Sequence, residues 1–382
     1  MRRAAAVCAL ILLGVACNNS TNAIPTPSVA TSARTVPPVG QPMDVVVGSA
    51  PTGGPANAMT VRIIDPHGFV VAKAAFTAPP APHVPDCDSV LQPPVRVGAG
   101  AAFYADSKGV VRRLDRSGTV SEVATFKLTS GQQFLSFAVS PDGKHLMASV
   151  ITVPAKGGQW TEDVERADAG GAAVVLSHGT FATALPTPLV ITGWDSGGPT
   201  ATTNSVVCTR ESLISHEYTG SALVHVGPDG RPLDRIGGSD CVPMDELPNG
   251  TVLCRIGLND CQSLNVRTSS GTTLWRRVPG CGFFEPRLSP DAQAVGVNAN
   301  FSIIYSRNVS KPASFAREES PNYALVGWAA PGIMLAVRQN GELGFASALN
   351  PLTFTPLGVN IGGQCIGCVP TGLTLAGLIP PA

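Results

Sequence analysis

Charged residues are scarce in this sequence, and neither sign is in excess. Only 14% of the 382 residues are charged, with 26 Lys and Arg against 26 Asp and Glu. A nucleic-acid-binding surface needs a basic patch that neutralises phosphates, and no sustained basic stripe occurs along the chain. The sequence therefore predicts no nucleic-acid partner.

Sustained helical periodicity is also missing. The 41 Gly and 34 Pro residues interrupt the chain too often for long helices. The strongest helix candidate, Thr161–Ala169 (TEDVERADA), is almost entirely polar, so we interpret it as a loop or a single helical turn. A chain of this length without helical patterning has to build its core from strands.

Recognisable catalytic motifs are absent as well. The sequence contains no Gly-x-Ser-x-Gly elbow, no phosphate-binding loop and no His-Glu-x-x-His helix. The densest polar cluster is TRESLISHEYTG, in which His216 and Glu217 follow Arg210 and Glu211. It can be read as an acid–base pair or as a solvated loop, and we favour the loop. We therefore predict no catalytic residue, no metal and no cofactor.

Isolated residues offer three weaker site hypotheses. Asp86 and Asp88 flank a cysteine, but an oxygen-only calcium site needs about six or more ligands. Trp194 and Trp328 could form an aromatic ligand platform, although their shared Gly-Trp context favours repeated packing positions. His145 follows a tight turn and is expected to be exposed.

The N-terminus combines a short basic region with an apolar run. Arg2 and Arg3 precede Ala4–Val15, which is too short for a permanent transmembrane helix of about 20 residues. A short basic region followed by a short apolar run is typical of an export signal.

The end of this run, LGVAC, resembles a bacterial lipobox, although Gly14 stands where Leu is more usual. The resemblance implies a signal peptide of residues 1–16 and a lipidated Cys17, with diacylglycerol on the thiol and a further acyl chain, such as palmitate, on the amine. Two or more acyl chains anchor a protein stably, whereas one is marginal. The alternative is an ordinary secretory signal that ends near a cysteine by chance.

Residues 17–43 read as a flexible tether. The segment after Cys17 is small, polar and Pro-rich, with no periodicity. It would hold a folded domain, residues 44–382, away from the lipid. We therefore expect a protein attached to the cell membrane by lipid and facing the extracytoplasmic side.

From about Val45, short apolar runs alternate with tight-turn signals. TVRIID meets Pro-His-Gly at 66–68, FLSFAVS meets Pro-Asp-Gly at 141–143, and LAVRQ meets Asn-Gly at 340–341. Asp-Gly and Asn-Gly supply the positive φ values of two-residue hairpins, so the pattern predicts an all-β domain.

Larger units repeat too. LVITGWDSGG (189–198) resembles ALVGWAAPGIMLAV (324–337), and FAVSPDGKHLMAS (137–149) resembles PRLSPDAQAVGVN (286–298). The intervals between repeated segments suit a four-stranded propeller blade of about 40 to 45 residues plus loop insertions. These segments begin near Val95, Phe134, Pro188, Val242, Phe283, Tyr323 and Cys368.

The two Ser-Pro-Asp hairpins resemble those of the WD-repeat-like, TolB-like β-propellers, in which such a turn links two strands of a blade. The resemblance implies the fold and not the function, because propellers include both scaffolds and enzymes. The sequence departs from the family in its low aromatic content of 5% and in lacking regular Gly-His and Trp-Asp dipeptides apart from Trp194-Asp195.

We predict a single propeller of about seven blades, with six or eight as alternatives and a pair of β-sandwiches as the competing fold. The last strand, within GCVPTGLTLAGLI, is too short for a blade of its own. We expect it to pair with the first segment, Val45–Thr77, because ring closure removes two open sheet edges.

After the signal and the lipidated cysteine, an even number of cysteines remains, which suggests disulfides in an exported chain. Cys254 and Cys261 flank RIGLND, and a hairpin there would bring them side by side. Bridges near blade junctions would tie adjacent blades, and Cys87 is expected to approach Cys365 or Cys368 if the ring closes. The disulfide candidates are Cys87, Cys208, Cys241, Cys254, Cys261, Cys281, Cys365 and Cys368.

The motif CIGC, Cys365–Cys368, has an alternative reading as a redox dithiol or half a zinc site. A thioredoxin-like site needs a βαβ setting, and zinc needs two further ligands; the sequence supplies neither. Structural disulfides are therefore the favoured interpretation.

Two functional classes remain. The first is a lipid-anchored, non-catalytic binding or scaffold protein that presents a rigid face to a protein, peptide or glycan. The second is an extracytoplasmic propeller enzyme, such as a metal-dependent lactonase or hydrolase, whose acidic or His side chains converge on the channel from several blades. The missing motifs favour the first class.

Overall fold

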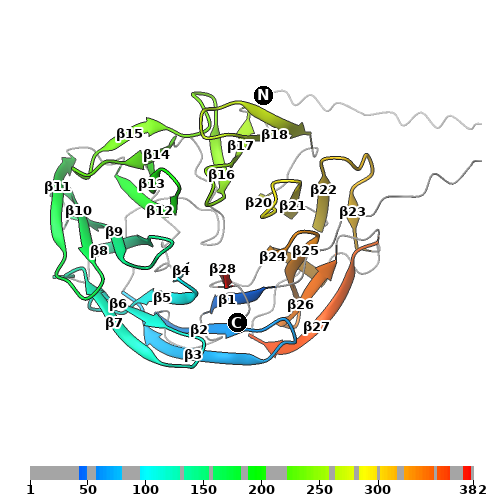
Figure 1. Ribbon diagram of the computed structural model, residues 1–382, viewed down its shortest axis with the longest axis horizontal. Helices are drawn as coiled ribbons and strands as arrows, with labels where there is room; N and C mark the ends of the chain where they lie inside the picture. The colour runs from blue at the N-terminus through cyan, green and yellow to red at the C-terminus, as the bar shows by residue number, and fades with distance from the viewer. Residues whose placement is uncertain are drawn as a thin grey trace, which may run out of the picture. The chain divides into compact units, whose positions relative to one another are not determined.

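A computed structural model describes the chain in segments, which all lie in one compact unit, Pro37–Ala382. The described residues are 43–49, 57–79, 95–129, 133–154, 158–181, 188–203, 222–257, 263–278, 284–298, 302–315, 322–347, 351–361 and 373–379. Their strands form seven four-stranded antiparallel sheets, which stand around a central axis as the blades of a propeller (Figure 1). The predicted all-β, seven-bladed propeller is confirmed.

Each blade runs outward from an inner strand next to the axis. The inner strands of blades 1 to 7 are β28 (Thr374–Ile379), β4 (Val95–Gly98), β8 (Gln133–Val139), β12 (Leu189–Asp195), β16 (Val242–Glu246), β20 (Phe284–Leu288) and β24 (Tyr323–Ala330). The second strands are β1 (Asp44–Ser49), β5 (Ala101–Ala105), β9 (His145–Thr152), β13 (Gly198–Thr203), β17 (Val252–Ile256), β21 (Ala294–Asn298) and β25 (Ile333–Arg338).

The third strand of each blade pairs with the second strand on one side and with the outermost strand on the other. They are β2 (Ala58–Ile64), β6 (Val110–Leu114), β10 (Trp160–Asp168), β14 (Ala222–Val226), β18 (Ser263–Arg267), β22 (Ser302–Ser306) and β26 (Glu342–Ser347). The outermost strands are β3 (Val70–Thr77), β7 (Val120–Thr125), β11 (Val174–Phe181), β15 (Pro232–Arg235), β19 (Thr273–Arg277), β23 (Ala313–Ser314) and β27 (Thr353–Asn360).

The last strand closes the ring, as predicted. Strand β28 pairs antiparallel with β1, from Asp44 opposite Ile379 to Gly48 opposite Thr374. Blade 1 is therefore built from both ends of the propeller domain, and neither β28 nor β1 is left as an open edge. The buried Asp44 carboxylate also lies 3.0 Å from Nε of Arg116, which joins blade 1 to blade 2.

The interpretation of Thr161–Ala169 as a loop or single turn is wrong, because all of this segment except Ala169 lies in strand β10 (Trp160–Asp168). Trp160, Glu162 and Val164 are buried, as a period of two requires. Polarity alone is misleading here, because the buried carboxylate of Glu162 accepts hydrogen bonds from the Ser149 hydroxyl at 2.8 Å and the Leu189 amide at 2.7 Å.

The tight turns differ in one detail from the predicted two-residue hairpins. Their Asp and Asn residues keep negative φ, and glycine takes the left-handed conformation, as at Gly68 with φ 88°. Asp65 instead caps its turn, since its Oδ1 accepts from the amides of His67 and Phe69 at 2.9 and 2.8 Å. Asp115 caps the corresponding turn of blade 2, between β6 and β7, in the same way.

The two Ser-Pro-Asp copies fold alike. Ser140 Oγ donates to Asp142 at 2.5 Å and accepts from the His145 amide at 2.9 Å. Ser289 makes the equivalent pair of hydrogen bonds at 2.6 and 2.8 Å. The sequence repeat is therefore a structural repeat, with both copies joining the first and second strands of a blade.

Blades pack face to face, and an apolar cluster lies at each of the seven junctions. Phe103 and Phe137, for example, are fully buried between blades 2 and 3. The cluster between blades 4 and 5 is small and includes two cysteines: Leu223, Ile236, Cys241, Val252 and Cys254. Polar contacts and the two cysteines therefore contribute more to holding blades 4 and 5 together than they do at the other junctions.

Inner strands are the edges of their sheets, so their backbone groups need partners from elsewhere. Side chains of the preceding blade supply several of them. Glu162 of blade 3 accepts from Leu189 of blade 4, and Asp245 of blade 5 accepts from the Leu288 amide of blade 6 at 2.7 Å. Buried polar residues thus join neighbouring blades at the channel wall.

Candidate functional site

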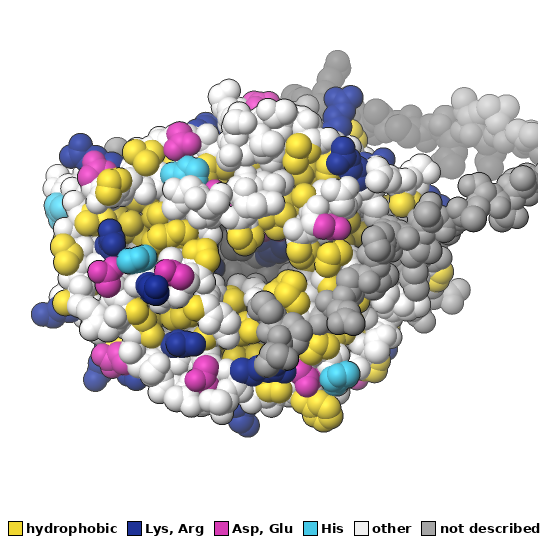
Figure 2. All heavy atoms as spheres, in the orientation of Figure 1, with side chains coloured by type: hydrophobic (Ala, Val, Ile, Leu, Met, Phe, Trp, Pro, Cys, Tyr) yellow, Lys and Arg dark blue, Asp and Glu magenta, His cyan; other side chains and the backbone are white. Residues whose placement is uncertain are grey.

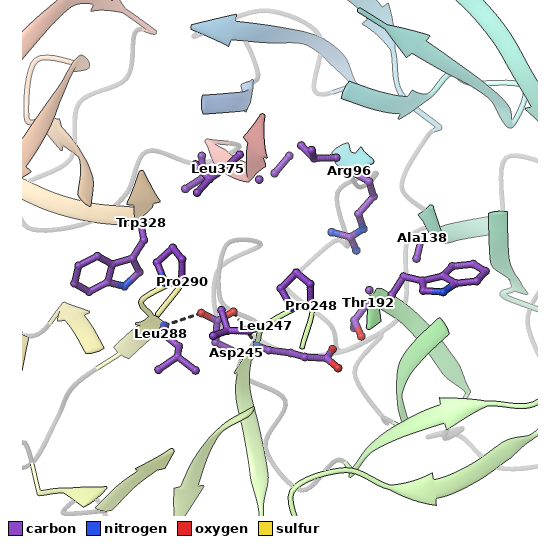
Figure 3. A pocket seen from close by; sticks show the side chains of 18 of the residues that line it. Arg96, Ala138, Thr192, Asp245, Leu247, Pro248, Leu288, Pro290, Trp328 and Leu375 are labelled. Carbon is purple, nitrogen blue, oxygen red and sulfur yellow. Dashed lines mark hydrogen bonds between the residues drawn. The ribbon is translucent and has the colours of Figure 1, made fainter. Parts of the chain in front are cut away.

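A cavity of about 840 Å³ lies at the centre of the ring, lined by residues of all seven inner strands. Figure 3 shows Arg96, Thr192, Asp245, Trp328 and Leu375 disposed around it. In the space-filling view, hydrophobic side chains gather around a hollow at the ring centre (Figure 2). A molecule in this cavity can contact every blade.

Turns between first and second strands border the cavity. The lining includes Gly98–Gly100, Pro141, Leu247–Asn249 and Pro290. Because the four strands of a blade alternate in direction, these turns lie at the same end of the ring as the turns between third and fourth strands. Both Ser-Pro-Asp turns therefore contribute a proline to the cavity.

Two tryptophans occupy matching places in the wall. Trp194 near the end of β12 and Trp328 near the end of β24 both line the cavity. The Trp328 indole donates to the Arg287 carbonyl at 2.8 Å, and Trp194 packs on the cluster between blades 3 and 4. The Gly-Trp repeat thus marks repeated packing positions, as predicted, and these positions also face the channel.

An acidic pair, Asp245 and Glu246, ends strand β16 in the cavity wall. Asp245 accepts from the Glu246 amide at 3.0 Å through Oδ1 and from the Leu288 amide through Oδ2. Burial raises the pKa of Asp245, while the positive charge of Arg287 and these two hydrogen bonds oppose the shift. Asp245 therefore serves the junction between blades 5 and 6.

Glu246 is placed differently. Its Oε2 accepts from the Thr200 hydroxyl of blade 4 at 2.8 Å, and its Oε1 is buried without a hydrogen-bond partner. Burial raises the pKa of Glu246 to about 8; the Thr200 hydroxyl opposes this shift and the nearby Asp195 carboxylate adds to it. The carboxyl is therefore mostly neutral at pH 7.

Behind this wall, His225 lies between two carboxylates. Its Nε2 is 3.0 Å from Asp195 Oδ1 and its Nδ1 is 3.2 Å from Asp234 Oδ1. Burial lowers the pKa of His225, but hydrogen bonds and charge from Asp195 and Asp234 together outweigh burial and raise it. Both ring nitrogens donate at once only in the imidazolium form, so this arrangement favours a cationic histidine.

One disulfide lies among the described residues, between Cys241 and Cys254. The expected hairpin pairing of Cys254 with Cys261 is therefore wrong. The strand ladder decides the partner, since Cys254 lies opposite Pro243 and Cys241 precedes that residue by two positions. The bridge ties the connection between blades 4 and 5 to strand β17.

Of the remaining candidate residues named from the sequence, one lies among the described residues and the others do not. His145 is half-buried and not fully exposed as predicted, because its ring packs beside Asp168, with Nδ1 2.7 Å from Asp168 Oδ1. The others lie outside the described residues, together with the signal and most of the tether: Cys17, Cys87, Cys208, Cys261, Cys281, Cys365, Cys368, Asp86, Asp88, Arg210, Glu211, His216 and Glu217.

Sequence reasoning missed Glu246, Thr202 and His225. Glu246 lies in MDEL, which reads only as a strand before a turn, and His225 lies in the apolar run SALVHVG. The available signal was a polar residue within a buried strand, which needs a partner or a role. Only the packing of blade 4 on blade 5 reveals that Thr202 and Glu246 line one cavity, with His225 behind its wall.

Within the part of the chain that the structure describes, no group of three or more His, Cys, Asp or Glu side chains is placed to hold a metal ion.

The same described residues include no helix with the length and hydropathy to cross a membrane.

Comparison with known proteins gives likenesses of fold. No family model matches the chain, and no curated protein matches it significantly. Among solved structures, oligogalacturonate lyase from Vibrio parahaemolyticus is similar at 9% identity and TM-score 0.46, over 78% of this chain and 82% of the lyase. A putative TolB from Agrobacterium tumefaciens is similar at 12% identity and TM-score 0.36, over 84% and 91%. BamB from Moraxella catarrhalis is similar at 11% identity and TM-score 0.37, over 71% and 85%.

Proposed function

We propose that this chain is a lipid-anchored, extracytoplasmic β-propeller that binds a partner at its central cavity and performs no chemistry on it. The observation that carries the proposal is the cavity itself. Its volume of about 840 Å³ and its lining from all seven blades suit a ligand-binding site.

The composition of the wall supports binding. Indole, proline and leucine side chains provide apolar area, and a few buried polar groups supply orientation. The wall is also rigid, because Trp328 and Asp245 are held by hydrogen bonds across blade junctions. A preformed site loses little conformational entropy on binding.

The site also suits a protruding segment of another protein. The turns at Pro141, Pro290 and Leu247–Asn249 border the cavity at one end of the ring. A loop or peptide of a protein partner can enter between them with its apolar side chains inside. Lipidation at Cys17 and the tether of residues 17–43 would present that end of the ring near the membrane surface.

The binding proposal is tested by photo-crosslinking at the cell surface. p-Benzoylphenylalanine replaces the exposed Pro248 at the cavity or, as a matched control, Leu233, which is 60% exposed on the outer strand β15. We expect a discrete crosslinked partner from the cavity position and none from the outer position. Equal labelling at both positions, or none at either, contradicts the proposal.

Anchoring is tested separately with an alkyne-tagged fatty acid. The wild-type chain should take up the label and remain in the membrane fraction after carbonate extraction. The Cys17→Ser variant should lose both properties, whereas Cys8→Ser, within the apolar run, should lose neither. Retained label in the Cys17→Ser variant would remove lipidation from the proposal.

The alternative of a metal-dependent lactonase or hydrolase has its own assay. Such an enzyme should purify with a stoichiometric divalent metal that Asp245→Asn or Glu246→Gln removes. That result would replace the binding proposal with an enzymatic one.

A further inference from the structure

The cavity wall between blades 4 and 5 contains two buried oxygens without hydrogen-bond partners. They are Oγ1 of Thr202, a residue that is 1% exposed, and Oε1 of Glu246. Both residues line the cavity, Thr202 on β13 of blade 4 and Glu246 at the end of β16 of blade 5, and Thr200, two residues before Thr202, donates to Glu246 Oε2. Buried polar atoms in folded proteins nearly always have a partner, so this pair indicates a bound group.

Charge compensation distinguishes Glu246 from the acids around it. Asp195 pairs with His225, with 3.0 Å between Asp195 Oδ1 and His225 Nε2. Asp245 accepts hydrogen bonds from two backbone amides, and the positive charge of Arg287 lowers its pKa against the effect of burial. Glu246 receives one hydroxyl hydrogen bond and forms no ion pair among the described residues, and the charge of His225 only partly offsets the effect of burial on its pKa. Arg96, the other cation of the wall, directs its Nε to the Phe137 carbonyl at 3.0 Å.

Gly193 lies beside this carboxyl and the hydroxyl that donates to it. A Cβ on Gly193 would lie 3.1 Å from Thr200 Oγ1 and 3.5 Å from Glu246 Oε2, so a side chain there would press on the Thr200 hydroxyl. The next residue, Trp194, contributes an indole to the same wall. An aromatic ring beside a carboxylate is a favourable setting for an organic cation.

We propose that Glu246 and Thr202 form a subsite for an alkylammonium group whose apolar body fills the rest of the cavity. The inference rests on the cavity being the binding site. In the complex, the ammonium donates to Glu246 Oε1 and Thr202 Oγ1, and the methylene chain lies along the apolar wall. The same group can come from a lysine side chain of a protein partner or from a free amine.

Proton release should accompany binding. Because burial raises the pKa of Glu246 to about 8, an ammonium ligand has to displace a proton at neutral pH. Affinity for the ammonium should therefore rise between pH 7 and pH 9, while affinity for a neutral probe should stay constant. A carbonyl ligand that accepts from the neutral acid would show the opposite trend.

The experiment uses the full chain in detergent and calorimetric titration with n-hexylamine, n-hexanol and n-hexanoate. We expect hexylamine to bind about tenfold more tightly than hexanol at pH 8, equivalent to about 1.4 kcal/mol. Glu246→Gln, which keeps the Thr200 hydrogen bond, should reduce hexylamine binding to the level of hexanol. The exposed Glu122→Gln variant is the matched control.

The outcomes separate the two proposals. Equal binding of hexylamine and hexanol, tighter binding of hexanoate, or an unchanged Glu246→Gln variant overturns the ammonium subsite and leaves the cavity as a binding site. Failure of every probe, together with no crosslink from position 248, overturns both. Titration with an acetylated Leu-Lys-Leu amide distinguishes the sources, since a lysine-presenting partner requires that peptide to bind in a Glu246-dependent way.

Discussion

Asn298 of blade 6 binds both backbone groups of Leu325 in blade 7. Its Nδ2 donates to the Leu325 carbonyl at 2.8 Å, and its Oδ1 accepts from the Leu325 amide at 2.9 Å. The side-chain amide therefore replaces a neighbouring strand at the edge of strand β24. This pair illustrates how the propeller satisfies its inner edges without adding strands.

Replacing this amide should weaken the ring measurably. Asn298→Ala leaves the amide and carbonyl of Leu325 buried without these partners, which should lower the free energy of unfolding by about 2–4 kcal/mol. Urea unfolding followed by tryptophan fluorescence measures the change. Asn308→Ala, at an exposed position, is the control and should stay within about 0.5 kcal/mol of wild type.

The Cys241–Cys254 disulfide closes a loop with a sequence separation of 13. Cys241→Ala combined with Cys254→Ala should reduce the free energy of unfolding by about 3 kcal/mol, because the unfolded chain regains loop entropy. Mass spectrometry of a non-reduced digest should recover the Cys241–Cys254 peptide pair. A dominant Cys254–Cys261 pair would contradict the structure.

Glu162 should make stability fall as pH rises. Burial raises its pKa to about 7, opposed by hydrogen bonds from Ser149 and Leu189, so the folded chain holds a proton that the unfolded chain releases near pH 4.5. Between these values the folded state should lose about 3 kcal/mol from this group. Glu162→Gln should remove that loss when unfolding is compared at pH 5 and pH 8.

The control for this measurement is Glu122→Gln, whose parent side chain is 59% exposed. It should retain the wild-type slope of stability against pH. If Glu162→Gln also retains that slope, the carboxyl is ionised in the folded protein and the predicted proton is not bound.

His225 should titrate above the usual range for histidine. The carboxylates of Asp195 and Asp234 raise its folded pKa despite the opposing effect of burial. Its stabilising contribution should be complete below about pH 6.5, the unfolded pKa, and should disappear as pH rises through the folded value. Imidazole NMR chemical shifts against pH measure the midpoint of His225 directly. A His225 midpoint below that of an unstructured histidine would show that burial dominates.

Local chemistry made the blade architecture predictable. The segments expected to start near Val95, Val242 and Tyr323 begin with those residues as strands β4, β16 and β24. Turn signals such as Asp65 to Gly68 act through hydrogen bonds within a few residues, so they can be read without the rest of the fold. Closure by β28 followed from the shortness of the last segment and the cost of an open edge.

Features that depend on contacts between blades were not predictable in this way. The polar segment at 161–169 became strand β10 because Ser149 and Leu189 satisfy the Glu162 carboxyl. Cys254 pairs with Cys241 because the register of β16 with β17 places Cys254 opposite Pro243, two residues after Cys241. Neither outcome is encoded in local periodicity.

The sequence by itself determined that this chain is all-β, where its blades begin, and how the ring closes, because turn chemistry and alternating polarity act over short stretches. Only the tertiary structure decided which polar side chains face the channel and which are buried against an adjacent blade. The carboxyl of Glu246 acquires its raised pKa from burial in the cavity wall, where Asp195 of blade 4 adds to the shift and the Thr200 hydroxyl of the same blade opposes it. Burial and charge proximity are properties of chains packed in space, and they set the chemistry of this cavity.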